Sequence, residues 1–465
     1  MLSFPLPAVR LCLAALLLTG CAHRSIRPPT TAAVPQGQVA TPADPDGWHQ
    51  VNGDSSLTRC SQAALNPPLR LAWRQPIPAG PIPPTYEDIP YFHGPLVAYA
   101  SAVYVSDTVS YIAVDTHSGR ILWSHAAITP AMPPSTQPPQ SIVATPTGLV
   151  YSDPPYVLGL SGTDGHVLFR KNVSYIGYGF TVGPILPLDN SRVVTSGKGM
   201  FIVVDNATGQ SLDHREVNYQ DRPYPNAPVQ TFGAEPFQIG LIPGPNPGVF
   251  ARDRLWLYSF EGGLHGRLRS RQYIGPNAVA AAQAGHVILF GNSGVSSLDL
   301  SLKTQWTTPL PPGGGPSRSL VPYATYPLAV TPKYLIAGDW KHLYGLDAAT
   351  GRRLWTAPWR GLPLTAEIPV YDVDERDLVP PVATAQVVYA LSRSGPKGPL
   401  NSVTAWSTST GRVLWSGRVG SNLRSLIVHD GAFYVGDEVS QNGKPPAHFL
   451  IKLIGAGQKT PQNGT

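Results

Sequence analysis

A short motif recurs along this chain and limits the folds that it can adopt. Asp-x-x-x-Gly-x-x-x-Trp occurs at 115–123 and again at 347–355, and a third copy at 407–415 has Ser in place of Asp. An Asp side chain can close a turn and Gly supplies a positive φ angle, so the motif predicts a tight turn between two antiparallel strands. The Trp on the second strand can then fill the space between neighbouring sheets. We assign to the repeat Asp115, Gly119, Trp123, Asp347, Gly351, Trp355, Gly411 and Trp415.

Degraded copies extend the pattern through most of the chain. They include Gly165 with Phe169, Gly209 with Asp213 in place of the Trp, a copy before Trp306 that is one residue short, and a doubtful one between residues 250 and 272. Successive aromatic positions are then roughly 40 to 60 residues apart, which is the length of a four-stranded propeller blade with its loops. The 46 Gly and 51 Pro residues also indicate an all-β chain.

The motif resembles the pyrroloquinoline-quinone-type (PQQ-like) repeat, a WD40-like propeller repeat. The opening stretch is similar too, with Trp48, a Gly-Asp pair at Gly53 and a strand that ends in Trp73. The resemblance covers residues 48–456 and implies an all-β, eight-bladed β-propeller with four-stranded antiparallel blades. We expect strand 69–76 to close the ring by joining the last strands of the chain. Seven blades is the alternative, because the copy between 250 and 272 is weak.

The beginning of the chain indicates export. Arg10 and the apolar run 11–18 are typical of a signal peptide, which we assign to residues 1–20. Leu18-Thr19-Gly20-Cys21 resembles a bacterial lipobox and predicts lipidation of Cys21; a plain signal peptide is the alternative. Ala follows the Cys where an Asp would favour the inner membrane, so we expect an anchor in the outer membrane, with the protein on its periplasmic face or at the cell surface.

Composition predicts the segments that flank the ring. Residues 21–47 are rich in Pro, Ala and Thr and read as a lipidated Cys with a disordered tether. Residues 457–465 read as a disordered tail. The net charge of +6 is small for 465 residues and does not indicate nucleic-acid binding.

The cysteines argue against a quinone-dependent dehydrogenase. Cys12 would leave with the signal peptide and Cys21 would carry lipid, so Cys60 has no partner for an internal disulfide. Such dehydrogenases hold PQQ against a vicinal Cys-Cys pair and bind Ca²⁺ through Glu, Asn and Asp. This chain has no such pair, and no quinone or calcium ligand can be assigned by position. We therefore expect no cofactor, with PQQ and Ca²⁺ as the alternative.

Three further features are candidates for binding sites. Asp372, Asp374 and Asp377 form the densest acidic cluster and could hold Ca²⁺, although their spacing is not that of an EF-hand and a solvated loop is the alternative. Arginines at alternating positions 267–271 would share one strand face, where they would meet either an anionic partner or solvent. Pro- and Tyr-rich insertions could present rigid aromatic side chains, or could simply cover the propeller. They span residues 77–95, 126–140, 218–248, 359–381 and 392–400.

These observations favour a monomeric, membrane-anchored propeller that binds an envelope protein without catalysing a reaction. We assign no catalytic residue. The layout is similar to that of the propeller lipoprotein of the outer-membrane β-barrel assembly machinery, which implies a scaffold role in the assembly of outer-membrane proteins. A quinone- or Ca²⁺-dependent oxidoreductase and a carbohydrate-binding propeller are the alternatives.

Overall fold

The computed structural model describes most of the chain after residue 57. The described residues are 58–78, 96–106, 110–126, 142–153, 156–173, 185–197, 200–216, 238–242, 248–252, 256–261, 268–274, 278–291, 294–310, 328–338, 342–359, 379–393, 399–441, 444–456 and 458. The chain divides into two compact units, Met1–Gly37 and Gln38–Thr465. Every described residue lies in the second unit, and only that unit is considered below.

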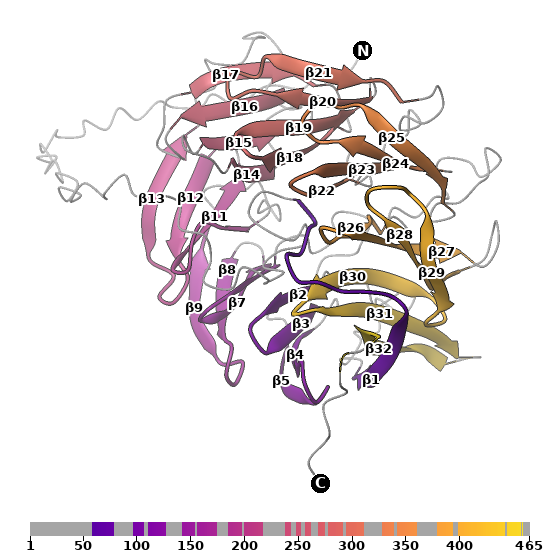
Figure 1. Cartoon of the computed structure of the whole chain (residues 1–465). Coiled ribbons are helices and arrows are strands. Elements are labelled where there is room, and N and C mark those ends of the chain that lie inside the picture. Colours follow the sequence, from indigo (N-terminus) through magenta and orange to yellow (C-terminus); the bar gives the residue numbers. More distant parts are fainter. Residues whose placement is uncertain are drawn as a thin grey trace, which may run out of the picture. The chain divides into compact units, whose positions relative to one another are not determined.

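The described residues form eight four-stranded antiparallel sheets, which are the blades of a propeller (Figure 1). Four blades come from the first half of the ring. Blade 1 has β2 (Leu96–Tyr99), β3 (Ala102–Ser106), β4 (Ser110–Asp115) and β5 (Ile121–Ala126); blade 2 has β6 (Ile142–Thr145), β7 (Gly148–Asp153), β8 (Tyr156–Ser161) and β9 (Val167–Asn172); blade 3 has β10 (Leu186–Pro187), β11 (Arg192–Gly197), β12 (Met200–Asp205) and β13 (Ser211–Glu216); blade 4 has β14 (Gln238–Ile242), β15 (Gly248–Arg252), β16 (Trp256–Glu261) and β17 (Leu268–Tyr273).

The second half of the ring repeats this order until its last blade. Blade 5 has β18 (Val279–Gln283), β19 (His286–Gly291), β20 (Gly294–Leu298) and β21 (Thr304–Thr308); blade 6 has β22 (Leu328–Val330), β23 (Tyr334–Gly338), β24 (His342–Asp347) and β25 (Arg353–Pro358); blade 7 has β26 (Val382–Ala383), β27 (Val387–Arg393), β28 (Leu400–Ser407) and β29 (Val413–Arg418); blade 8 has β30 (Leu423–His429), β31 (Ala432–Gln441), β32 (Lys444–Gly455) and β1 (Leu69–Ile77).

The ring closes through strands from both ends of the described chain. β1 pairs with β32 as the outermost strand of blade 8, with Leu69 opposite Gly455 and Ile77 opposite His448. The innermost strand of blade 8, β30, contacts β2 of blade 1. The predicted eight-bladed fold and its closure by strand 69–76 are therefore confirmed. The seven-blade alternative is wrong, because the weak copy between 250 and 272 belongs to a complete blade 4.

Burial follows the position of a strand within its blade. The inner and middle strands are covered on both faces by neighbouring blades, so β3 and β20 are buried at every residue. The outermost strands alternate with solvent, as the pattern of β17 shows. The core thus consists of aliphatic and aromatic side chains between adjacent sheets.

The aromatic residue of one blade packs against the turn glycine of the next. Trp123 of blade 1 donates from Nε1 to the carbonyl of Gly162 in blade 2 at 3.0 Å. A Cβ atom on Gly165 would lie 2.6 Å from the Trp123 ring. Trp355 is related to Gly411 in the same way, again at 2.6 Å. The repeat therefore couples neighbouring blades, and its glycine is required both for a positive φ angle and for space.

Two degraded copies of the motif keep the architecture by other means. In blade 5 the turn is one residue shorter, and Leu302 takes the positive φ of 58° that Gly supplies elsewhere. The Leu302 N–H donates to the carbonyl of Asp299 at 2.8 Å, so the shorter turn still closes. In blade 3 the Trp position holds Asp213. Phe201 of blade 3 meets Phe260 of blade 4 edge-on, with ring centroids 6.2 Å apart, and fills the space between these two blades.

Candidate functional site

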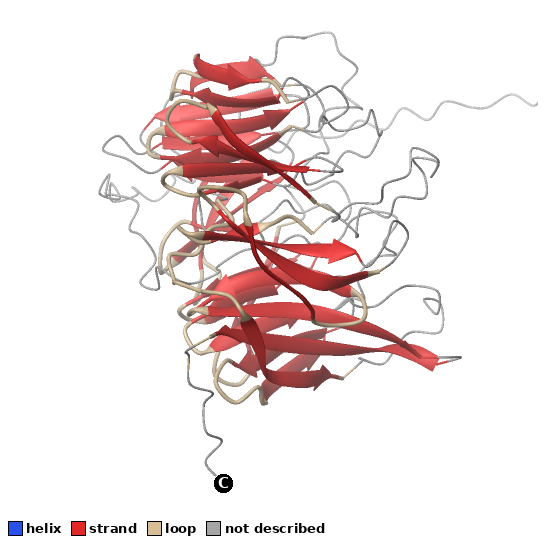
Figure 2. Ribbon diagram, turned by 45° about the vertical axis from the view of Figure 1, so that its right-hand side comes forward, coloured by secondary structure: helices blue, strands red, loops and turns tan. Residues whose placement is uncertain are grey.

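The described turns of seven blades gather on one side of the ring, which we call the turn face, and the turns of blade 4 lie outside the described residues. They join the first strand of a blade to the second and the third to the fourth, and Figure 2 shows the described ones along one side of the strands. The turn face comprises residues 99–102, 115–120, 145–148, 161–166, 188–192, 205–210, 283–286, 299–303, 331–334, 347–352, 384–387, 407–412 and 429–432.

Main-chain hydrogen bonds tie the two turns of a blade together. The N–H of Thr116 donates to the carbonyl of Ser101 at 2.8 Å, and that of Gly162 donates to Thr147 at 2.9 Å. The equivalent N–H to carbonyl hydrogen bond is donated by Asn206 to Ser191, by Ala348 to Lys333 and by Thr408 to Gln386. Because each turn is held at its neighbour, the backbone of the turn face is ordered before any partner binds.

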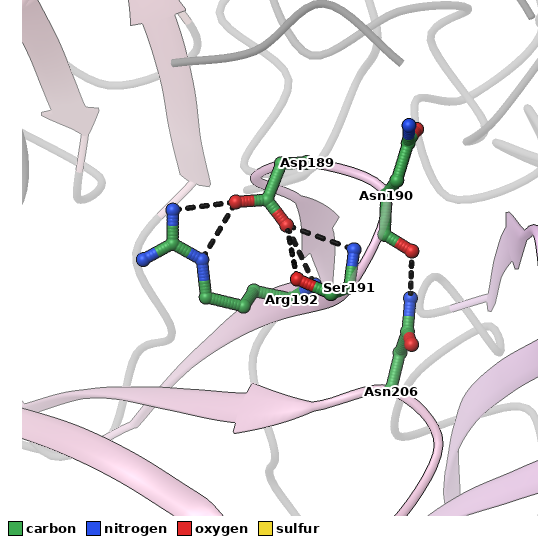
Figure 3. Close-up of polar contacts among 5 residues, drawn as sticks. All are labelled: Asp189, Asn190, Ser191, Arg192 and Asn206. Carbon is green, nitrogen blue, oxygen red and sulfur yellow. Dashed lines mark hydrogen bonds and ion pairs between the residues drawn. The ribbon is translucent and has the colours of Figure 1, made fainter. Parts of the chain in front are cut away.

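The turns of blade 3 show how side chains reinforce this order (Figure 3). One carboxylate oxygen of Asp189 accepts hydrogen bonds from the N–H groups of Ser191 at 2.8 Å and Arg192 at 2.9 Å. Its other oxygen pairs with the Arg192 guanidinium, with Nε at 2.6 Å. Burial alone would raise the pKa of Asp189, but the hydrogen bonds from Arg192 and Ser191 lower it below its ordinary value. The Asn206 amide donates to the carbonyl of Asn190 at 2.9 Å and joins this turn to the next.

The motif carboxylates serve the turns in the same way. Asp115 accepts hydrogen bonds from the N–H and hydroxyl of Ser118, at 2.6 and 2.7 Å. Asp347 accepts the corresponding pair from Thr350, at 2.9 and 2.8 Å. In blade 7 the hydroxyl of Ser407 accepts the N–H of Thr410 at 3.3 Å. These three side chains close turns, and their geometry explains why Ser can replace Asp.

The segment before β1 crosses the turn face from the inner strands to the outermost one (Figure 1). Cys60 forms a parallel bridge with Ala383 at the end of β26, and Ser61 donates its N–H to the Ala383 carbonyl at 2.9 Å. The N–H of Val330 in blade 6 donates to the carbonyl of Thr58 at 2.7 Å. The Tyr389 hydroxyl donates to the carbonyl of Leu65 at 2.7 Å. This segment therefore adds main-chain pairing to the inner edges of blades 6 and 7.

Arg59 anchors that segment. Its side chain is 6% exposed, and its guanidinium donates to the carbonyls of Pro381 at 3.2 Å and Pro380 at 3.4 Å. Its backbone has a positive φ of 52°, which is uncommon for a residue with a side chain. Sequence reasoning missed this residue, because nothing in the local pattern indicates that an arginine before β1 reaches blade 7.

Blade 8 holds a buried charged cluster near the ends of strands β30, β31 and β32 that lie away from the turn face. The carboxylate of Asp437 is fully buried, accepts the N–H groups of Ser421 and Asn422 at 2.7 and 2.9 Å, and pairs with Arg74 at 3.0 Å. Glu438 pairs with Arg424 at 3.2 Å. These contacts join β1, β30 and β31, and so reinforce the closure of the ring.

His448 lies opposite Glu438 in this cluster and is 4% exposed. Burial, with a smaller contribution from the charge of Arg424, lowers the pKa of His448 from 6.5 to about 4. The imidazole is therefore neutral at pH 7 in the folded protein.

Several sequence-predicted sites lie outside the described residues. They are the acidic cluster Asp372, Asp374 and Asp377, the lipidation site Cys21, and most of the Pro- and Tyr-rich insertions. Within the Arg-rich stretch, Arg269 and Arg271 are exposed on one face of β17, and Arg267 is outside the described part. His429 is buried, with Nε2 at 2.7 Å from the Ala100 carbonyl, and so serves the contact between blades 8 and 1.

The described residues do not fit a quinone cofactor with calcium. Calcium requires six to eight oxygen ligands, several of them carboxylates. No group of three or more His, Cys, Asp or Glu side chains in the described part of the chain could hold a metal ion. The described inner strands that line the ring axis are chiefly aliphatic, as Ile142–Thr145 and Val279–Gln283 illustrate. We derive no reaction step through PQQ.

Comparison with known proteins agrees with the repeat. The family model described as outer membrane protein assembly factor BamB, a PQQ-type repeat model, matches residues 265–444. No curated protein sequence matches the chain. No helix in the described ranges has the length and hydropathy needed to cross a bilayer.

Several solved structures match the chain at low sequence identity. BamB from Moraxella catarrhalis is 13% identical, with 78% of this chain and 82% of that chain covered and a TM-score of 0.36. The quinohemoprotein alcohol dehydrogenase ADHIIG from Pseudomonas putida HK5 is 12% identical, with 90% and 81% covered and a TM-score of 0.40. Sqt1 from Saccharomyces cerevisiae is 11% identical, with 76% and 93% covered and a TM-score of 0.49. At these identities the likenesses carry no functional inference.

The matched segment spans blades 5, 6 and 7 together with parts of blades 4 and 8. Its motif is the one that couples Trp123 to blade 2 and Trp355 to blade 7. The described strands therefore form an eight-bladed β-propeller, and its segment 265–444 matches a PQQ-type repeat model.

Proposed function

We propose that this propeller is a lipid-anchored, non-enzymatic scaffold that binds another protein of the bacterial envelope through its turn face. The observation that carries the proposal is the order of that face, whose paired turns are held by main-chain hydrogen bonds in blades 1, 2, 3, 6 and 7. A surface that is ordered in advance loses little conformational entropy on binding, so more of the contact energy appears as affinity.

The side chains at the tips of the turns support a protein partner. Many of the exposed ones are small, such as Ala207, Ala284, Ala349 and Ser409. Small side chains lose little rotamer entropy when they are covered, and they let another backbone approach closely. The matched family is described as an outer membrane protein assembly factor, which makes components of that machinery the first partners to test.

The membrane anchor in this proposal rests on the sequence. The apolar run 11–18 is followed by the lipobox-like Leu18–Cys21, and a lipid on Cys21 would keep the propeller at the outer membrane. Intact-mass measurement of the protein from membranes tests this part. A mass increase consistent with acylated Cys21 supports it, and a mature chain without lipid contradicts it.

Site-specific photocrosslinking in cells tests the docking face. A photoreactive amino acid would replace Ala207, Ala284 or Ala349 on the turn face, with Thr307 and Thr356 on the outermost strands as matched controls. We expect the turn-face positions to yield one common crosslinked protein and the control positions to yield none. Crosslinks confined to the outermost strands would overturn the assignment of the turn face.

A further inference from the structure

The outermost strands of three adjacent blades form a surface that is basic and partly apolar. The strands are β29 of blade 7, β1 of blade 8 and β5 of blade 1, and blade 8 lies between the other two in the ring. With the turn residues that precede β5 and β29, we call this surface the basic arc. Its cationic residues are Arg70, Arg120, Arg412 and Arg418. Arg74, also on β1, is paired with the buried Asp437 and is not counted.

The charge of the basic arc is mainly positive. β29, β1 and β5 contain no Asp or Glu. The turn that precedes β29 uses Ser407 where other blades use Asp, and β32 joins β1 by strand pairing alone, with no hairpin turn to supply a carboxylate. The turn that precedes β5 keeps Asp115, whose carboxylate accepts hydrogen bonds from its own turn. By contrast, the sequence of β13 in blade 3 has two acidic residues and one arginine. The positive charge is therefore uneven around the circumference of the ring.

Exposed apolar side chains lie among these arginines. Of the seven large hydrophobic side chains that are exposed in the described part of the chain, four belong to the basic arc: Leu71 at 58%, Val413 at 50%, Leu122 at 46% and Leu414 at 39%. A purely electrostatic surface has no need of such side chains. Burying one of them in an apolar environment is favourable in proportion to the area removed from water.

The two motif leucines are exposed because their outermost strands have one face toward solvent. Along β5, Leu122 and Ser124 are exposed while Trp123 between them is buried. Along β29, Leu414 and Ser416 are exposed on either side of the half-buried Trp415. A β-bulge lies at both positions, since the pairing passes from Ile121 to Trp123 and from Val413 to Trp415.

From this combination we propose that the basic arc binds the surface of an anionic membrane, so that the ring stands on its edge with blade 8 against the lipid headgroups. Arginines attract the headgroups, and the exposed leucines and valine enter the boundary between headgroups and acyl chains. The inference rests on the proposed membrane location and adds an orientation to it.

This orientation is compatible with the scaffold role. The turn face lies at one end of the strands and the basic arc lies mainly on their outer side, with only Arg120 and Arg412 belonging to both. A ring on its edge therefore leaves most of the turn face open to a protein partner (Figure 2). A lipid on Cys21 would also raise the effective concentration of the surface at the bilayer, so that a weak affinity is sufficient.

Vesicle co-sedimentation tests the proposal without the anchor. The unit Gln38–Thr465 contains all described strands and can be tested by itself. We expect it to bind vesicles of phosphatidylcholine mixed with phosphatidylglycerol, to bind vesicles of phosphatidylcholine alone far less, and to dissociate as salt is added. Failure to bind the mixed vesicles at low salt, with a circular dichroism spectrum typical of β-structure, would overturn the proposal.

Matched variants assign the binding to the basic arc. Replacement of Arg120, Arg412 and Arg418 by Gln should lower the partition coefficient by about fivefold for each arginine. The same charge change at Arg269, Arg271 and Lys303, in blades 4 and 5, should leave the coefficient within about twofold. Equal losses in both variants would mean that net charge, and not the basic arc, governs binding.

Substitution of the exposed leucines distinguishes binding to a membrane from binding to a soluble anion. The variant Leu71→Ser, Leu122→Ser, Leu414→Ser keeps every charge and should lose about fivefold in partition for each leucine. If this variant showed no loss, and if the protein bound a soluble acidic polymer equally well, the ligand of the basic arc would be such a polymer and not a membrane. Photocrosslinking from the turn face is independent of these results, so failure of the orientation and failure of the scaffold role are distinguishable.

Discussion

Replacing Gly411 by Ala should destabilise the ring more than the backbone angle alone explains. Gly411 has a φ of 67°, and a Cβ atom there would lie 2.6 Å from the Trp355 ring of the preceding blade. The left-handed conformation costs about 1 to 2 kcal/mol for a residue with a side chain. The overlap with a buried ring should add about 1 to 3 kcal/mol. We therefore expect Gly411→Ala to lower the free energy of unfolding by about 3 kcal/mol.

Gly285 provides the matched control. It has a φ of 84°, and nothing lies within 4 Å of the position that its Cβ would take. Gly285→Ala should therefore show only the backbone cost of about 1 kcal/mol, reduced because Ala also restricts the unfolded chain. Urea unfolding of Gln38–Thr465, followed by tryptophan fluorescence, measures both variants, and they are compared at equal m-value. Equal destabilisation by the two substitutions would refute the coupling of blades through Trp355.

Two further predictions concern titratable groups. His448 is neutral in the folded protein, because its pKa is lowered from 6.5 to about 4. The free energy of unfolding should therefore fall by about 2 kcal/mol, after solvent screening, as the pH drops from 6.5 toward about 4. Urea unfolding midpoints at pH 7 and pH 5, for the wild type and for His448→Gln, measure this effect. A hydrogen bond from Thr350 is the main cause of the lowered pKa of Asp347. The stability that the Asp347 carboxylate adds to the folded protein is therefore fully present above the unfolded pKa of 3.8, and it is lost as the pH falls through the lower folded pKa. Asp347→Ser, which copies Ser407 of blade 7, should cost less stability than Asp347→Ala, which should cost about 1 kcal/mol.

Each of these predictions has a result that contradicts it. A pH dependence that persists in His448→Gln would assign the acid sensitivity to another group. Equal stability losses for Asp347→Ser and Asp347→Ala would show that the hydroxyl does not replace the carboxylate in this turn.

The fold could be predicted from the sequence because each residue of the repeat motif specifies a local structure or contact. Asp115 and Gly119 specify a turn, and Trp123 specifies the contact with the next blade. Even the short copy was recognisable, since Asp299 keeps its place while Leu302 takes over the positive φ. The alternative of seven blades arose where aromatic contacts such as Phe201 with Phe260 replace the motif, since such contacts leave no regular spacing in the sequence.

The candidate surfaces could not be predicted, because they exist only after the ring closes. Arg70 and Arg418 are separated by most of the chain, and blades 7 and 8 bring their strands into adjacent positions. Arg59 reaches Pro380 and Pro381 in blade 7 across a similar separation. No periodicity in a single sequence reports such contacts.

The central proposal is that this propeller acts through its surface and not through a bound quinone. The most direct test is a calorimetric titration of the purified protein with PQQ in the presence of Ca²⁺, together with metal analysis and an assay of dye reduction on alcohols and sugars. The aliphatic inner strands and the lack of a carboxylate cluster among the described residues predict no stoichiometric binding and no dye reduction. Binding of one PQQ per chain with substrate-dependent dye reduction would contradict the account and establish an oxidoreductase.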